Sequence, residues 1–192
     1  MTRVVHGGPR GDRVRGRVGP AEANGIMRRV PLSSFVLALV ACVGCDHASK
    51  HAAGLLLAGG DRIALASDTV RLELVSNPGA FLSLGAGLPE PLRNAVLVGL
   101  VPVLLATVIV CFWRPDHRAR RDLVALGLVA GGGLGNWLDR LLHAGAVTDF
   151  VSVGLGRFRT GVFNLADLAI VAGVMLLVLA RRGGRASGEG TV

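Results

Sequence analysis

The strongest constraint on how this 192-residue chain can fold is a set of long segments that almost lack charge. Asn94–Trp113 contains no charged side chain, and Gly161–Ala180 contains only Asp167. Each segment has about the 20 residues that a helix needs to cross the hydrocarbon core of a bilayer. Pro31–Leu57 and Leu123–Leu142 are two further apolar segments. The sequence therefore predicts an all-α membrane protein with four transmembrane helices.

The distribution of basic residues argues against nucleic acid as a partner, although the formal net charge is +8. Of the 21 Lys and Arg residues, 14 lie before Pro31, after Ala180 or in the link between the second and third apolar segments. Basic clusters beside apolar segments mark the cytoplasmic side of a membrane. Aromatic residues make up only 4% of the chain, so bases would find few stacking partners.

Four crossings place both termini on the same side of the membrane, and the basic clusters identify that side as the cytoplasm. Residues 1–26 are predicted to be a disordered basic tail, with Met27 as an alternative start of the protein. Residues 27–180 form the predicted four-span domain, and residues 181–192 a second cytoplasmic tail. The outer connections are then Ala58–Arg93 and His143–Thr160.

The first outer connection contains a pattern typical of a strand. Thr69–Val75 alternates apolar and polar residues. Asn77-Pro-Gly then favours a turn, and Phe81–Leu84 could return as a second strand. We therefore expect a small extracytoplasmic β element at the membrane surface.

Polar residues within the apolar segments converge at one depth. An ionisable group at membrane depth is costly and is by default a candidate functional group. With the predicted topology, the polar residues of the first, third and fourth segments all lie toward the outer face. They are Asp46 and Lys50, then Asn136, Asp139 and Arg140, and finally Asn164 and Asp167.

Two carboxylates are candidates for acid–base chemistry. Asp149 lies just outside the fourth apolar segment and Asp167 just inside it, so a loop that folds back could bring them together. Two carboxylates in a partly desolvated site share one proton, which gives one base and one acid. Taken as an isolated pair, a buried structural acid and a loop acid are the simpler interpretation.

Other residues of the apolar segments allow different chemistries. Cys42 and Cys45 form a C-x-x-C pair, which leaves a membrane thiol–disulfide oxidoreductase as the alternative function. His47 and His51 have a metal-ligand spacing but lack the Glu of the metalloprotease motif, so no metal or other cofactor is expected. The Gly-rich run 131–135 follows no strand and is interpreted as a helix-packing surface rather than a phosphate loop.

Five motifs in order resemble those of the lipoprotein signal peptidases (signal peptidase II), the four-span bacterial aspartyl proteases. The resemblance extends over about residues 27–180. The motifs are Asp46-His-Ala-Ser-Lys50, Asn77-Pro-Gly79, Gly131-Gly-Gly-Leu-Gly-Asn-Trp-Leu-Asp-Arg140, Val147-Thr-Asp-Phe150 and Phe163-Asn-Leu-Ala-Asp167.

This resemblance implies a monomeric endopeptidase of the bacterial inner membrane, with its active site at the outer face. Its substrates would be diacylglyceryl-modified prolipoproteins, cleaved just before the lipidated cysteine, and its other partner membrane lipid. The catalytic residues would be Asp149 and Asp167. Positions that shape the substrate groove or support the pair would be Asn77, Gly79, Asn136, Arg140 and Asn164, and structural polar positions would be Asp46, Lys50 and Asp139.

Overall fold

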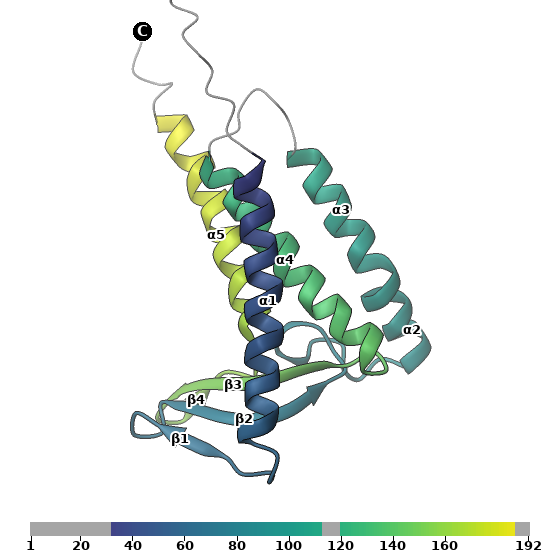
Figure 1. Ribbon diagram of the computed structural model, residues 1–192, viewed down its shortest axis with the longest axis vertical. Helices are drawn as coiled ribbons and strands as arrows, with labels where there is room; N and C mark the ends of the chain where they lie inside the picture. Colours follow the sequence, from purple (N-terminus) through teal and green to yellow (C-terminus); the bar gives the residue numbers. More distant parts are fainter. Residues whose placement is uncertain (1–31, 113–119, 187–192) are drawn as a thin grey trace, which may run out of the picture.

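The computed structural model describes residues 32–112 and 120–186, and the predicted N-terminal tail lies outside these ranges. Four helical rods rise from a small antiparallel sheet (Figure 1). The rods are α1 (Ser33–Leu56); α2 (Glu90–Asn94), the π-helical η2 (Ala95–Leu100) and α3 (Val101–Phe112) in succession; α4 (Arg120–Leu142); and α5 (Leu165–Ala186). Helix α5 thus includes the first residues of the predicted C-terminal tail.

Composition alone supports only one membrane crossing among residues 32–112 and 120–186. Glu90–Thr107 is long and apolar enough to cross a bilayer, whereas Leu165–Leu179 is apolar but shorter. The C-terminal halves of α1 and α4 carry Asp, Lys and Arg side chains, which lower their apolar character. The fold is therefore established as helix-rich with a small sheet, and four crossings remain a prediction.

The second rod contains a local irregularity with an identifiable partner. Pro102, the second residue of α3, has no backbone N–H to donate and lies just after the π-helical segment η2. The carbonyl oxygen of Val98, four residues earlier, accepts a hydrogen bond from Trp137 Nε1 of α4 (2.9 Å). The indole thus satisfies a backbone acceptor beside the proline and ties the second rod to α4.

Both outer connections contribute to one sheet, with the strand order β1-β2-β3-β4 and antiparallel neighbours. The strands are β1 (Ile63–Leu65), β2 (Val70–Asn77), β3 (Val147–Leu155) and β4 (Phe158–Arg159). The strand predicted from Thr69–Val75 is confirmed, but the predicted return strand at Phe81–Leu84 is wrong. Phe81–Ser83 forms a 3₁₀ turn, η1, in which Leu82 has a φ of 53°. Because β2 pairs with β3 instead, Val75 lies opposite Asp149.

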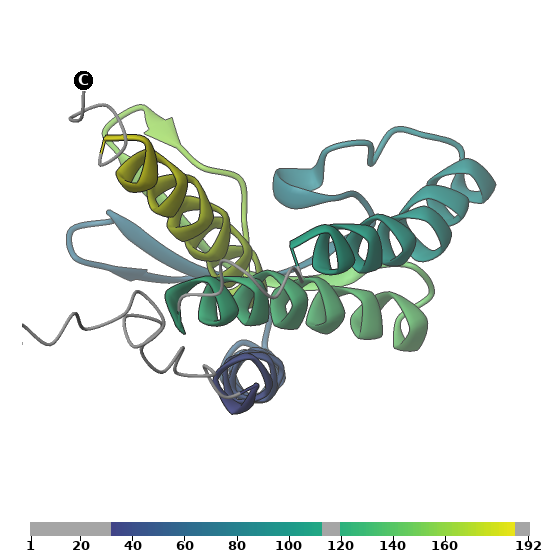
Figure 2. The same cartoon turned by 90° about the horizontal axis from the view of Figure 1, so that it is seen from above.

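Small residues let α4 pack closely against its neighbours, as the Gly pattern predicted. Seen along the helices, α4 lies between α1 and the other rods (Figure 2). A Cβ added at Gly127 would lie 2.6 Å from the carbonyl oxygen of Phe35 in α1, and one at Gly131 would lie 2.9 Å from that of Leu39. Gly132 faces the backbone of Ala166 in α5 in the same way. The Gly-rich run is therefore a helix interface on two sides.

Replacing Gly132 by Ala should destabilise the α4–α5 contact, because the new Cβ would overlap the carbonyl oxygen of Ala166. Overpacking of this kind costs about 1–3 kcal/mol. The measurement is the thermal unfolding midpoint in detergent. Gly44→Ala in α1 is the matched control, since nothing lies within 4 Å of its added Cβ. Equal midpoints for the two variants would contradict the proposed packing.

Candidate active site

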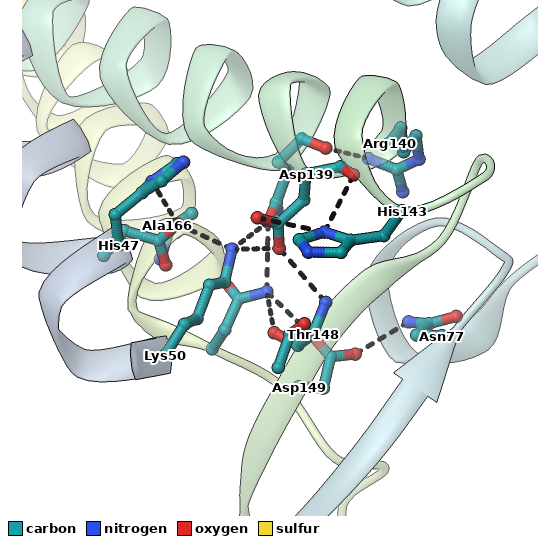
Figure 3. A network of polar contacts seen from close by, with 12 residues as sticks. His47, Lys50, Asn77, Asp139, Arg140, His143, Thr148, Asp149 and Ala166 are labelled. Atoms are coloured by element: carbon teal, nitrogen blue, oxygen red, sulfur yellow. Dashed lines mark hydrogen bonds and ion pairs between the residues drawn. The ribbon is translucent and has the colours of Figure 1, made fainter. Parts of the chain in front are cut away.

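The polar residues predicted to converge do so at the junction of α1, α4, the start of α5, and the strands β2 and β3. Figure 3 shows part of this network. Every one of the ten predicted site positions is buried, and the least buried of them is only 9% exposed. They are Asp46, Lys50, Asn77, Gly79, Asn136, Asp139, Arg140, Asp149, Asn164 and Asp167.

Asp149 and Asp167, hereafter the carboxylate pair, are connected by a single residue. The side-chain Nδ2 of Asn164 donates to Asp149 Oδ1 (2.7 Å), and its backbone N–H donates to Asp167 Oδ2 (3.3 Å). An antiparallel bridge between Val151 and Phe163 holds the chain before α5 against β3. The segment between the two aspartates folds back as expected, and it does so through strand pairing. The pairing fixes the positions of the two side chains.

Three asparagine amides donate hydrogen bonds to the carboxylate pair. Asn77 Nδ2 donates to Asp149 Oδ2 (2.8 Å), and Asn136 Nδ2 donates to Asp167 Oδ1 (2.9 Å). Asn164, described above, is the third. Together these amides place an N–H group on three of the four carboxylate oxygens of the pair.

The oxygen end of each amide is held by its own donor, which fixes the direction of its N–H groups. Asn77 Oδ1 accepts from the backbone N–H of Gly79 (2.8 Å), and Asn164 Oδ1 accepts from that of Asp167 (3.0 Å). Asn136 Oδ1 accepts from Lys50 Nζ (3.2 Å) and from Asn164 Nδ2 (3.0 Å). Lys50 is the one charged side chain among these donors.

Asp46, Lys50 and Asp139 form a buried ion cluster next to the amides. Lys50 Nζ lies 2.6 Å from Asp46 Oδ2, as their four-residue spacing predicted, and 2.9 Å from Asp139 Oδ2. Asp46 Oδ1 accepts from the backbone N–H of Ala166 (3.0 Å), and Asp139 Oδ2 from that of Thr148 (3.1 Å). The cluster therefore joins α1, α4, α5 and β3. Ala166 and Thr148 contribute only backbone groups, which leave no sequence signal.

Arg140 ties α4 to the turn that follows β2. Its Nη2 donates to the carbonyl oxygen of Gly79 (2.7 Å), and its Nη1 donates to that of Asn136 (3.0 Å). A Cβ added at Gly79 would lie 2.7 Å from the backbone of Ser83 and Leu84, so only glycine fits this close turn. Both residues thus set the position of the turn over the carboxylate pair.

Burial raises the pKa of Asp149 from its ordinary value of 3.8 to about 6. The hydrogen bond from Asn77 opposes this shift, the charge of Asp167 adds to it, and the bond from Asn164 and the charge of Lys50 again oppose it. A carboxylic acid with this pKa and a second carboxylate beside it can hold a proton near neutral pH. The arrangement can supply an acid and a base together.

The C-x-x-C pair is not part of this arrangement. Cys42 and Cys45 are free thiols on α1, half-buried and exposed respectively. Cys42 Sγ lies 4.0 Å from the carbonyl oxygen of Leu128, on the face that packs against the Gly-rich run of α4. Neither thiol takes part in the hydrogen bonds described above for the carboxylate pair and its amides.

A buried pair of carboxylates held by amides is an arrangement suited to the acid–base chemistry of aspartic proteases. A solved structure described as a bacterial membrane enzyme has the same fold, with a TM-score of 0.69 and 22% identity. The matched region covers 83% of this chain and 94% of the chain in that structure. A second structure with the same description gives a TM-score of 0.62 and 23% identity.

Comparison with protein families gives the particular assignment. The sequence profile of signal peptidase II matches residues 38–181, and the chain belongs to this family. It is 36% identical over 146 residues to a lipoprotein signal peptidase of Pelotomaculum thermopropionicum, covering 76% of this chain and 88% of the relative. It is 40% identical over 137 residues to a lipoprotein signal peptidase of Burkholderia cenocepacia, covering 69% and 78%. None of these matches supports the thiol–disulfide alternative.

The raised pKa of Asp149 should make the stability of the protein depend on pH. The folded state binds this proton more tightly than the unfolded chain, so stability falls as pH rises from about 4 to 6. The loss for a two-unit shift is about 3 kcal/mol. Asp149→Asn should remove this part of the dependence, which thermal unfolding in detergent between pH 4 and 8 can measure. Asp61→Asn, the same change at an exposed position, should keep the wild-type slope. Equal slopes for wild type and Asp149→Asn would refute the shift.

Proposed function

We propose that this protein removes signal peptides from diacylglyceryl-modified prolipoproteins, cleaving just before the lipidated cysteine. The two relatives compared above are both named lipoprotein signal peptidases. The observation that carries the proposal is that one residue, Asn164, donates hydrogen bonds to both aspartates. Its side chain donates to Asp149 and its backbone N–H donates to Asp167. This shared donor supports a catalytic role for the two aspartates as one unit.

The proposed chemistry is hydrolysis by acid–base catalysis. The ionised carboxylate takes a proton from water as the water oxygen attacks the scissile carbonyl carbon. The protonated carboxyl gives its proton to the carbonyl oxygen, which produces a tetrahedral diol. Return of a proton to the amide nitrogen then breaks the C–N bond and releases the signal peptide and the mature amino terminus. Every group in this sequence comes from the pair, water and substrate, and the proposal includes no metal or other cofactor.

The distribution of polar and apolar side chains supports four membrane crossings. Charged and amide side chains are buried at the junction of helices and sheet, while large apolar side chains face outward. Leu37 of α1 and Val110 of α3 are each 71% exposed, and Leu179 of α5 is 58% exposed. A water-soluble domain has the reverse arrangement, and an outward apolar surface of this extent fits lipid.

The proposed orientation places both termini in the cytoplasm and the sheet at the outer face of the inner membrane. The basic residues of the tails and of the α3–α4 link favour this orientation. Two apolar side chains flank the turn of the β3–β4 hairpin, Leu155 at 79% and Phe158 at 85% exposed, with the exposed Arg157 between them, and this combination suits the membrane–water interface. A lipid-modified cysteine has its adjoining peptide bond at the same depth. The enzyme is proposed to act as a monomer in contact with membrane lipid.

Asp149→Asn and Asp167→Asn should each reduce turnover of a purified lipidated precursor by at least about 100-fold, because either change removes the acid–base pairing. The double variant should be little worse than either single variant, since the two residues act as a unit. Asp61→Asn is the matched control and should stay within about twofold of wild type. EDTA should have no effect on wild-type turnover. Near-normal turnover by Asp167→Asn, or abolition by EDTA, would show that the mechanism is wrong.

Topology can be tested with reporter fusions. A periplasm-active phosphatase joined at Asp68 should be active, and one joined at Asp122, at the start of α4, should be inactive. Green fluorescent protein joined at the same sites should give the opposite pattern, because it folds in the cytoplasm. The reversed pattern would place the carboxylate pair on the cytoplasmic side and overturn the orientation.

A further inference from the structure

The single lysine of the chain lies next to the candidate active site. Of the 21 Lys and Arg residues only Lys50 is a lysine, so every other basic position is an arginine. Its side chain is 6% exposed and lies on α1, far in sequence from the carboxylate pair. The question is therefore which contacts an ammonium makes at this position that a guanidinium could not make.

The surroundings of Lys50 match the shape of an ammonium group. Its Nζ has three acceptors, Asp46 Oδ2 at 2.6 Å, Asp139 Oδ2 at 2.9 Å and Asn136 Oδ1 at 3.2 Å. An ammonium carries three N–H groups on one atom, so each acceptor receives one of them. A guanidinium spreads its donors over a planar fork and cannot direct three of them from one point.

The third acceptor connects Lys50 to the carboxylate pair. Asn136 Oδ1 accepts from Lys50, and its Nδ2 therefore points to Asp167 Oδ1 (2.9 Å). The same oxygen also accepts from Asn164 Nδ2, which donates to Asp149. Lys50 is thus linked to Asp167 through one amide, Asn136, and to Asp149 through two, Asn136 and Asn164. If Asn136 turned over, its oxygen would face Asp167 and its NH₂ would face the ammonium, and both contacts would be repulsive.

We propose that Lys50 is a positioning residue of the active site. Its ammonium holds the Asn136 amide in the orientation that donates to Asp167, and its charge offsets the buried Asp46 and Asp139 so that one member of the carboxylate pair can ionise. This inference rests on the proposed function of the pair. It assigns Lys50 a role in turnover, beyond the structural role that the family resemblance implies.

Several other groups titrate or carry charge around Lys50, and the test has to separate them. His47 Nδ1 lies 3.8 Å from Asp46 Oδ2, and His143 Nδ1 lies 3.9 Å from Asp139 Oδ1. The test therefore uses a background in which both histidines are replaced by Gln. The other charged or titratable side chains near Lys50, at the end of the surrounding elements where helices and sheet meet, are Asp46, His51, Asp139, Arg140, Asp149 and Asp167.

The first part of the experiment follows turnover of a purified lipidated precursor against pH for Lys50→Met and Lys50→Arg. Loss of the charge in Lys50→Met should reduce turnover at least tenfold and move the whole pH–rate profile to higher pH, because ionisation of the pair becomes harder. Lys50→Arg keeps the charge, so its profile should stay near that of wild type while turnover still falls at least tenfold. A shift of the profile does not depend on how much protein is folded.

A compensated variant separates positioning from charge. Lys50→Met combined with Asp46→Asn keeps the net charge of the ion cluster at its wild-type value but removes the donor to Asn136. Its profile should return toward that of wild type while its turnover stays at least tenfold low. Asp46→Asn alone, which keeps Lys50, should lose less turnover than the combined variant.

Four results would overturn the proposal. They are near-normal turnover in Lys50→Met, an unshifted profile in Lys50→Met, full recovery in the combined variant, and failure of all Lys50 variants to insert, which would make Lys50 a folding residue. Failure of the proposed function is seen separately, because wild type would then not cleave the precursor. If Asp149→Asn loses cleavage while Lys50→Met keeps it, the role of Lys50 is rejected and the proposed function of the carboxylate pair stands.

Discussion

The whole structure depends on the need to satisfy buried carboxylates inside the protein. Four aspartates, Asp46, Asp139, Asp149 and Asp167, lie at the junction of helices and sheet, and each is at most 6% exposed. In a medium of low polarity an unpaired charge of this kind would cost several kcal/mol. Lys50, three asparagine amides and the backbone N–H groups of Thr148, Asn164 and Ala166 remove that penalty. Because these partners come from α1, α4, α5 and the sheet, satisfying the charges also fixes how the elements meet.

The four aspartates of this network have two different kinds of partner. Asp46 and Asp139 contact the lysine ammonium directly, so their charge is balanced locally. Asp149 and Asp167 receive only neutral donors, and they share Asn164. Neutral donors orient a carboxylate without balancing its full charge, which leaves this pair able to exchange a proton. In the proposed mechanism the two reacting acids are those that have no cation of their own, and most of the polar cluster holds them in place.

Sequence patterns predicted the helices and the convergence of the polar residues in the apolar segments, because apolar length, Gly spacing and polar residues within apolar segments are local signals. Asn77 and Gly79 were expected near them only from the family resemblance. The strand over Thr69–Val75 followed from its alternation. The return strand at Phe81–Leu84 was wrong, because the partner of β2 lies in the second outer connection and pairing between distant strands has no local signature. The backbone donors of Ala166 and Thr148 were missed for a similar reason. The number of membrane crossings is the part of the fold that stays a prediction.

The pairing of β2 with β3 has a consequence for biosynthesis. Asn77 and Asp149 are 72 residues apart in the chain, and Asp46 and the Ala166 N–H are 120 apart. Contacts of such separation form only after the later segment has been made. A nascent chain with its first three rods inserted would therefore have neither the sheet pairing nor Asp167 in place. With Asp149 and Asp167 as the proposed catalytic pair, proteolytic competence would arise only with the last helix, and the ribosome-bound intermediate would not cut other chains.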